Sequence, residues 1–105
     1  MLNINGKEYG LFWSVWANCE YEDWLLSREK VSFPRAFVQK AVIMNKAYRD
    51  ANGGGNELKT KDLLSLPASE LNAIMDAVTA QELLDSGRTV EAEADDQGNA
   101  ESPEE

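Results

Sequence analysis

The stretch NINGKEYGLFW, Asn3–Trp13, decides how the fold begins. Leu2 and Ile4 flank a polar residue at strand spacing, and the Asn-Gly pair that follows suits the positive φ angles of a two-residue hairpin turn. The segment KEY then returns the chain, and Gly10 weakens the second strand or ends it. The sequence therefore predicts a β-hairpin within residues 1–13.

The rest of the chain predicts helices, on which a hairpin that is marginal in isolation can pack. Apolar spacing indicates a helix over about residues 14–28 and a longer one over about residues 32–51, which NGGGN ends. A short turn begins at Thr60, and a last helix runs from Pro67 to near residue 87. We expect a mainly α fold, a small helical domain of three to four helices with an N-terminal hairpin.

Charge divides the chain into a body, residues 1–87, and an acidic tail, residues 88–105. The 105 residues carry 10 Lys and Arg against 19 Asp and Glu, a formal net charge of -9. Seven of the acids and one base lie beyond residue 87. The tail contains too few apolar residues to build a core, so we predict that it is disordered.

Composition excludes several classes of function. Lys and Arg nowhere form the cluster that phosphate-backbone binding needs, so we expect no nucleic-acid partner. No secretory signal or apolar run of membrane length is present, so we expect no membrane partner. A single cysteine cannot form an internal disulfide, which favours a reducing, cytoplasmic setting.

The candidate chemical sites are weak, and we predict no catalytic, cofactor-binding or metal site. The chain has no histidine to activate Cys19, which we expect to be a small buried side chain. Glu20 and Asp23 have helical spacing but no further ligand, so a solvated face is favoured over a metal site. Gly53–Gly55 follow a helix and lack the Gly-Lys-Ser/Thr end of a phosphate loop, which favours a helix stop.

The aromatic residues point to burial or to binding, since large aromatics dominate both cores and interface hot spots. Trp13 and Trp24 share one stripe of the first helix and are predicted to lie in the core. Trp16 points away from that stripe, which leaves open an interface role, a place in the core or a contact with the hairpin.

This layout resembles the phage tail assembly chaperones of siphophage-type viruses and related prophages. The resemblance lies in the opening NINGKEY, the aromatic-rich FWSVWANCEYEDWL, the segment LPASELNAIMDAV and the acidic end after RTVE. It implies a non-enzymatic chaperone of the bacterial host cytoplasm that forms rings or helical multimers. It also implies two partners, the long tape measure protein and the tail-tube subunits that assemble around it.

If the resemblance holds, the hairpin is an adhesive edge between subunits of a homo-oligomer. We predict that the strand backbone joins a neighbouring subunit together with the side chains of Leu2, Ile4, Tyr9 and Phe12. Trp16 is the further interface candidate. The alternatives are a hairpin that is a lid on its own core, and a small acidic regulatory or adaptor protein that binds a protein partner through charge.

Overall fold

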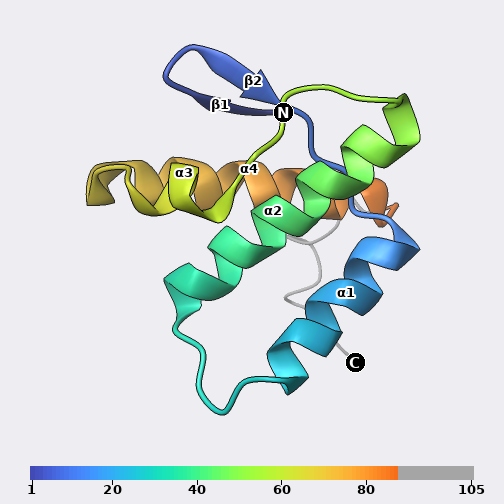
Figure 1. Cartoon of the computed structure of the whole chain (residues 1–105), viewed down its shortest axis with the longest axis vertical. Helices are drawn as coiled ribbons and strands as arrows, with labels where there is room; N and C mark the ends of the chain where they lie inside the picture. Colours follow the sequence, from blue (N-terminus) through green and yellow to red (C-terminus); the bar gives the residue numbers. More distant parts are fainter. Residues whose placement is uncertain (88–105) are drawn as a thin grey trace, which may run out of the picture.

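The computed structural model describes residues 1–87, and the predicted disordered tail at 88–105 lies outside them. The elements in chain order are β1 (Leu2–Ile4), β2 (Lys7–Tyr9), α1 (Val15–Leu26), α2 (Phe33–Asn52), α3 (Thr60–Leu64), the 3-10 turn η1 (Ala68–Glu70) and α4 (Leu71–Asp85). The prediction of a mainly helical fold with an N-terminal β-hairpin is confirmed (Figure 1).

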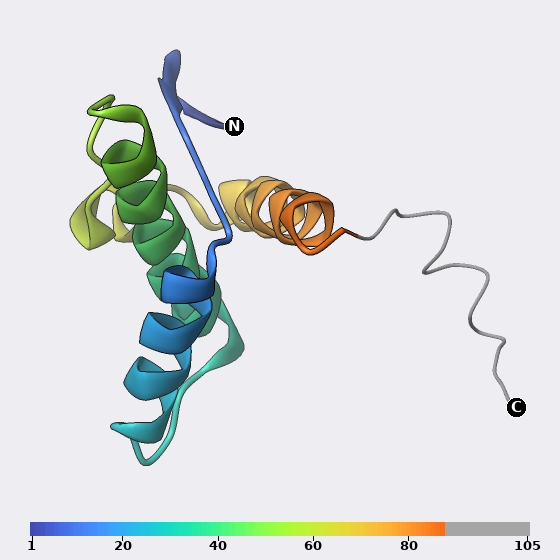
Figure 2. The ribbon, with the colours of Figure 1, turned by 90° about the vertical axis from the view of Figure 1, so that its right-hand side faces the viewer.

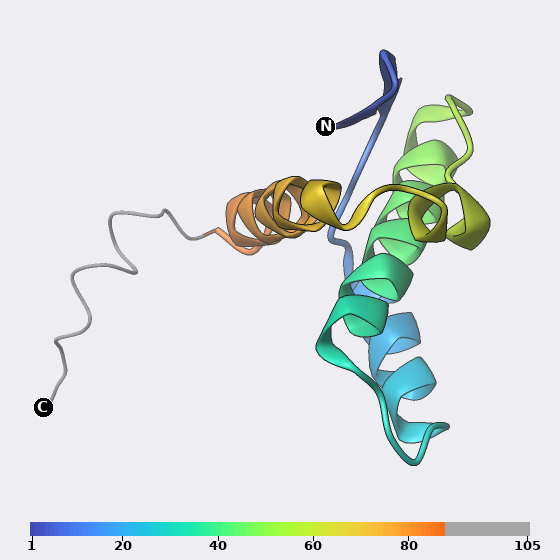
Figure 3. The same cartoon turned by 90° about the vertical axis from the view of Figure 1, so that its left-hand side faces the viewer.

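The long helix α2 is the centre of the arrangement, because α1, α3 and α4 all pack against it. Viewed from one side, α1 and α2 form a pair while α4 lies nearly end-on beside them (Figure 2). The opposite view shows the hairpin beside the C-terminal end of α2 and α3 farther down, alongside the same helix (Figure 3). Strand β1 contacts α4, so the hairpin lies over the junction of α2 and α4.

Local sequence signals explain most element boundaries. Asn5 and Gly6 adopt φ angles of 52° and 79°, as the predicted hairpin turn requires. The hydroxyl of Ser14 accepts the Ala17 N–H at 3.0 Å and caps α1. Gly53, with φ of 74°, ends α2 in the left-handed conformation. The three glycines are thus a helix stop, as predicted.

The hydrophobic core contains the inward side chains of the hairpin. Its main cluster draws on both strands, on α2, α3 and α4 and on the segments between them: Leu2, Ile4, Tyr9, Leu11, Val38, Ala41, Met44, Leu58, Leu63, Ile74 and Val78. Helix α1 contributes instead to a smaller cluster of Ala17, Ile43 and Ala47. The hairpin therefore gains its stability by covering the chain's own helices.

A buried asparagine on α2 forms hydrogen bonds with the segment that precedes the helix bundle and with the loop that follows α2. The side-chain amide of Asn45 donates to the carbonyls of Gly10 at 3.0 Å and Asn56 at 3.1 Å. Its carbonyl oxygen accepts the Leu58 N–H at 2.8 Å. The Asn56 amide in turn donates to the Glu8 carbonyl at 2.7 Å. One side chain thus links the exit of the hairpin to the loop after α2.

Replacing Asn45 with Ala should lower the free energy of unfolding by about 2–4 kcal/mol, because buried backbone groups would lose their partners. Asn52→Ala is the matched control, since the Asn52 amide donates only to Tyr48 on an exposed turn of the same helix. It should cost less than about 0.5 kcal/mol. Urea denaturation of both variants measures the difference, and equal losses would contradict a central role for Asn45.

Gly10 marks a close approach between the hairpin exit and α2. A Cβ atom at this position would lie 2.1 Å from the ring of Tyr48. The glycine that weakens strand β2 in the sequence is therefore needed for packing, since any side chain here displaces the tyrosine ring.

Gly10→Ala should destabilise the protein by about 1–3 kcal/mol through overpacking against Tyr48. The same change in a Tyr48→Ala background should cost much less, because the ring that the new methyl group would meet is gone. A double-mutant cycle by thermal or urea unfolding gives the coupling. Additive losses would show that the two residues do not clash.

Candidate protein-binding surface

The structure corrects part of the predicted hairpin interface. Leu2, Ile4 and Tyr9 are only 3%, 8% and 6% exposed and belong to the chain's main core cluster. Side chains this buried present no surface to a neighbouring subunit. The prediction erred because a β-strand side chain with apolar spacing serves a core or an interface equally well, and only the three-dimensional packing distinguishes the two.

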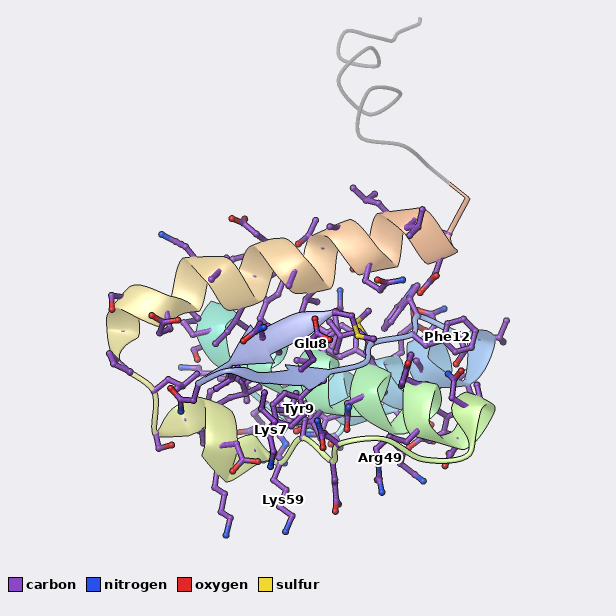
Figure 4. The ribbon with its side chains drawn as sticks, turned by 90° about the horizontal axis from the view of Figure 1, so that it is seen from above. Lys7, Glu8, Tyr9, Phe12, Arg49 and Lys59 are labelled. Atoms are coloured by element: carbon purple, nitrogen blue, oxygen red, sulfur yellow. The ribbon has the colours of Figure 1, made fainter. Side chains whose placement is uncertain are left out.

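The other two interface candidates are exposed. Phe12 and Trp16 retain 36% and 40% of their surface, and an interface role for them stays a prediction. Figure 4 shows Phe12 near the start of α1, away from the label on Tyr9. One face of Trp16 is covered by the Lys46 ammonium group, 5.7 Å from the ring centre.

Val15 at the start of α1 and Leu84 near the end of α4 are further exposed apolar side chains. Their side chains are 83% and 67% exposed. A hollow of about 200 Å³ lies between the start of α1 and the end of α4, and Val15 lines it beside Asp85. The Asp85 carboxylate accepts a hydrogen bond from the backbone N–H of Trp13 at 2.8 Å, which joins the start of α1 to the end of α4. We call Phe12, Val15, Trp16 and Leu84 the apolar patch.

A groove lies at the opposite end of α4, where α2 and α4 begin and α3 ends. Its volume is about 140 Å³ and its lining is almost wholly apolar: Pro34, Val38, Leu63, Leu64, Leu66, Pro67, Ala68, Leu71 and Ile74, with Arg35 as the charged member. Leu64 on its rim is 49% exposed, and the neighbouring Phe33 is 65% exposed. We call this feature the apolar groove.

A second, polar hollow lies between the hairpin turn and α3. It measures about 550 Å³ and is lined by turn residues together with Asp62 and Ser65. Three titratable side chains, Lys7, Tyr9 and Asp62, are among the residues that line it.

Lys40 joins three helices in an aromatic enclosure. Its ammonium group lies 5.0 Å from the ring centre of Trp13, 4.7 Å from that of Tyr21 and 5.7 Å from that of Phe37. It also contacts the Glu82 carboxylate of α4 at 2.8 Å. Burial raises the pKa of the Tyr21 hydroxyl above 10.0, and the negative charge of Glu82 raises it further. The cluster holds α1 and α4 on α2.

Lys40→Ala should lower the free energy of unfolding by about 1–2 kcal/mol, because a largely buried ion pair and several cation–π contacts are lost together. Lys46→Ala is the matched control on the same helix, since Lys46 and Asp50 form a pair that is 59% and 64% exposed. That change should cost less than about 0.5 kcal/mol. Chemical denaturation compares the two, and similar losses would contradict the role given to the enclosure.

The candidate chemical residues of α1 all lie on the surface of the helix. Cys19 is exposed, so the prediction that it is buried is wrong: Ala17 is the one side chain of α1 that the fold buries. Glu20 and Asp23 are both exposed on the same helix. Within residues 1–87, no group of three or more His, Cys, Asp or Glu side chains gathers in metal-binding proximity.

The tryptophans predicted for the core divide between two settings. Trp13 is half-buried and packs against both core clusters. Trp24 lies outside both, contrary to prediction: it stacks on Tyr21 at 6.4 Å, and the Arg28 guanidinium lies 5.1 Å from its ring centre. The helical stripe was identified correctly. However, α1 packs against α2 through its first turns, and its last turns are exposed to solvent.

Comparisons with protein-family models, curated proteins and solved structures find no match to this chain. Among the helices of residues 1–87, none combines the length and the apolar character that crossing a bilayer requires.

Proposed function

We propose that the chain is a non-enzymatic phage or prophage tail assembly chaperone, which self-assembles and binds the tape measure protein in the host cytoplasm. The observation that carries this proposal is the pair of exposed apolar surfaces, the patch and the groove, on so small a helical body. Large exposed apolar side chains gathered in one area are typical of protein-binding sites. The resemblance of the opening and aromatic segments supplies the kind of partner.

The size of the groove supports a protein partner over a small molecule. Its 140 Å³ is well below the roughly 300–1,000 Å³ of ordinary ligand pockets, and its lining offers Arg35 as the only charged group. A hollow of this kind fits one or two apolar side chains projecting from a folded or helical segment.

The proposal is tested by producing the chain together with the tape measure protein encoded in the same genome. We expect the two proteins to co-purify, and the soluble yield of the tape measure protein to rise several-fold when the chain is present. Leu64→Asp, which places a charge on the rim of the groove, should reduce the co-purified amount. A tape measure protein that stays unbound and insoluble beside the folded chain would contradict the proposal.

The second candidate is a small acidic regulatory or adaptor protein, which the net charge of -9 favours. Salt separates the two functions, because about 1 M salt shortens the Debye length to roughly 3 Å and suppresses attraction between surface charges. A partner held by apolar contacts should remain bound under these conditions. Release of the partner by salt would instead favour the adaptor.

A further inference from the structure

We propose that the apolar patch of one copy docks into the apolar groove of a second copy, in a head-to-tail contact that repeats from subunit to subunit. This inference rests on the self-assembly that is part of the proposed function, and it names the surfaces and the symmetry. The contact between patch and groove takes the place of the predicted hairpin interface, because the hairpin side chains are buried in the chain's own core.

The two surfaces lie at opposite ends of the molecule. Helix α4 spans the body, and it begins beside the start of α2 and ends beside the start of α1 (Figure 1). The groove is formed where α2 and α4 begin, and the patch where α4 ends and α1 begins. One patch can therefore occupy the groove of a neighbour while leaving its own groove open. Such a contact is heterologous and forms a ring or a filament.

The two surfaces match in apolar character. The groove is a hollow of side-chain size with Phe33 and Leu64 exposed beside it. The patch presents Val15 at the first turn of α1, where the side chain is 83% exposed and has no cover within residues 1–87. Docking would remove both sets of apolar side chains from water, at about 25 cal/mol for each Å² of apolar surface.

Charge favours this pairing over contact between like ends. Arg28 and Arg35 flank the groove and form no ion pair within residues 1–87. Helix α4 carries three acids, including Asp85 at the patch, and no base. Its C-terminal end adds the negative pole of the helix dipole, and the start of α2 at the groove adds a positive one.

The sequence beyond α4 strengthens the same polarity. Residues 88–105 continue from the patch end and contain seven acids against one base. We therefore commit to a second copy of the chain, patch into groove, as the occupant.

Light scattering on paired variants tests both the surfaces and the symmetry. The patch variant carries Val15→Asp and Leu84→Asp, and the groove variant carries Phe33→Asp and Leu64→Asp; all four side chains are exposed, so folding should persist and circular dichroism verifies it. Each variant alone should associate at least about 100-fold more weakly than the wild type, because two apolar anchors are lost. Thr79→Asp, exposed on α4 away from Leu84, is the matched control and should assemble like the wild type.

Mixing the two variants distinguishes a heterologous contact from every symmetric alternative. Each variant keeps one intact surface, so an equimolar mixture should form a 1:1 dimer and nothing larger. A mixture that stays monomeric, or variants that assemble like the wild type, would overturn the inference while leaving self-assembly itself in place. A wild-type chain that is monomeric at all concentrations would instead overturn the self-assembly of the proposed function. Loss of tape measure binding with unchanged self-association would assign the groove to the client and also overturn the inference.

Discussion

The buried side chain of Asn45 is the constraint on which the rest of the structure depends. Its amide and carbonyl satisfy three backbone groups that belong to the hairpin exit and to the segment after α2. Those segments lie 35 and 11–13 residues away in sequence. The hairpin exit is also held by the Phe12 backbone N–H, which donates to the Met44 carbonyl of α2 at 3.0 Å. A buried polar group without partners costs about 1–3 kcal/mol. The helix α2, the hairpin exit and the segment after α2 therefore keep one relative arrangement, because any displacement would leave several of these groups unpaired at once. The position of the hairpin over the helices follows from this link.

Fixing the hairpin in this way changes what its apolar side chains do. A body of fewer than 90 residues buries a limited core, and Leu2, Ile4 and Tyr9 supply part of it. The same side chains cannot serve a neighbour unless the hairpin detaches, which would break the Asn45 and Asn56 hydrogen bonds as well. The proposed self-association therefore relies on side chains that remain exposed in the folded chain. Those lie at the two ends of α4, where the core is already complete.

Local signals in the sequence predicted the elements well but not their partners. The Asn-Gly turn, the Ser14 cap and the glycines after α2 each act within a few residues, so the hairpin and the helix ends could be predicted. Asn45 was not identified, because an asparagine within a helix has no signature that reveals partners 35 residues away. The groove was missed for the same reason, since α2, α3 and α4 each contribute only a few of its residues. Cys19 and Trp24 were misplaced because periodicity identifies a helix face but not how far its neighbour extends along it.

The arrangement of α4 explains why assembly through its two ends would leave each subunit intact. Lys40 and Glu82 hold the second half of α4 on α2, while Ile74 and Val78 fill the core beneath its first half and middle. Of these residues, Lys40, Val78 and Glu82 lie outside the lining of the groove, so a docked neighbour would leave their contacts in place. A surface presented on such a rigid element loses little conformational freedom on binding. In the proposed assembly the groove stays open when the patch is occupied, so growth would stop only when a ring closes or a client occupies the last groove.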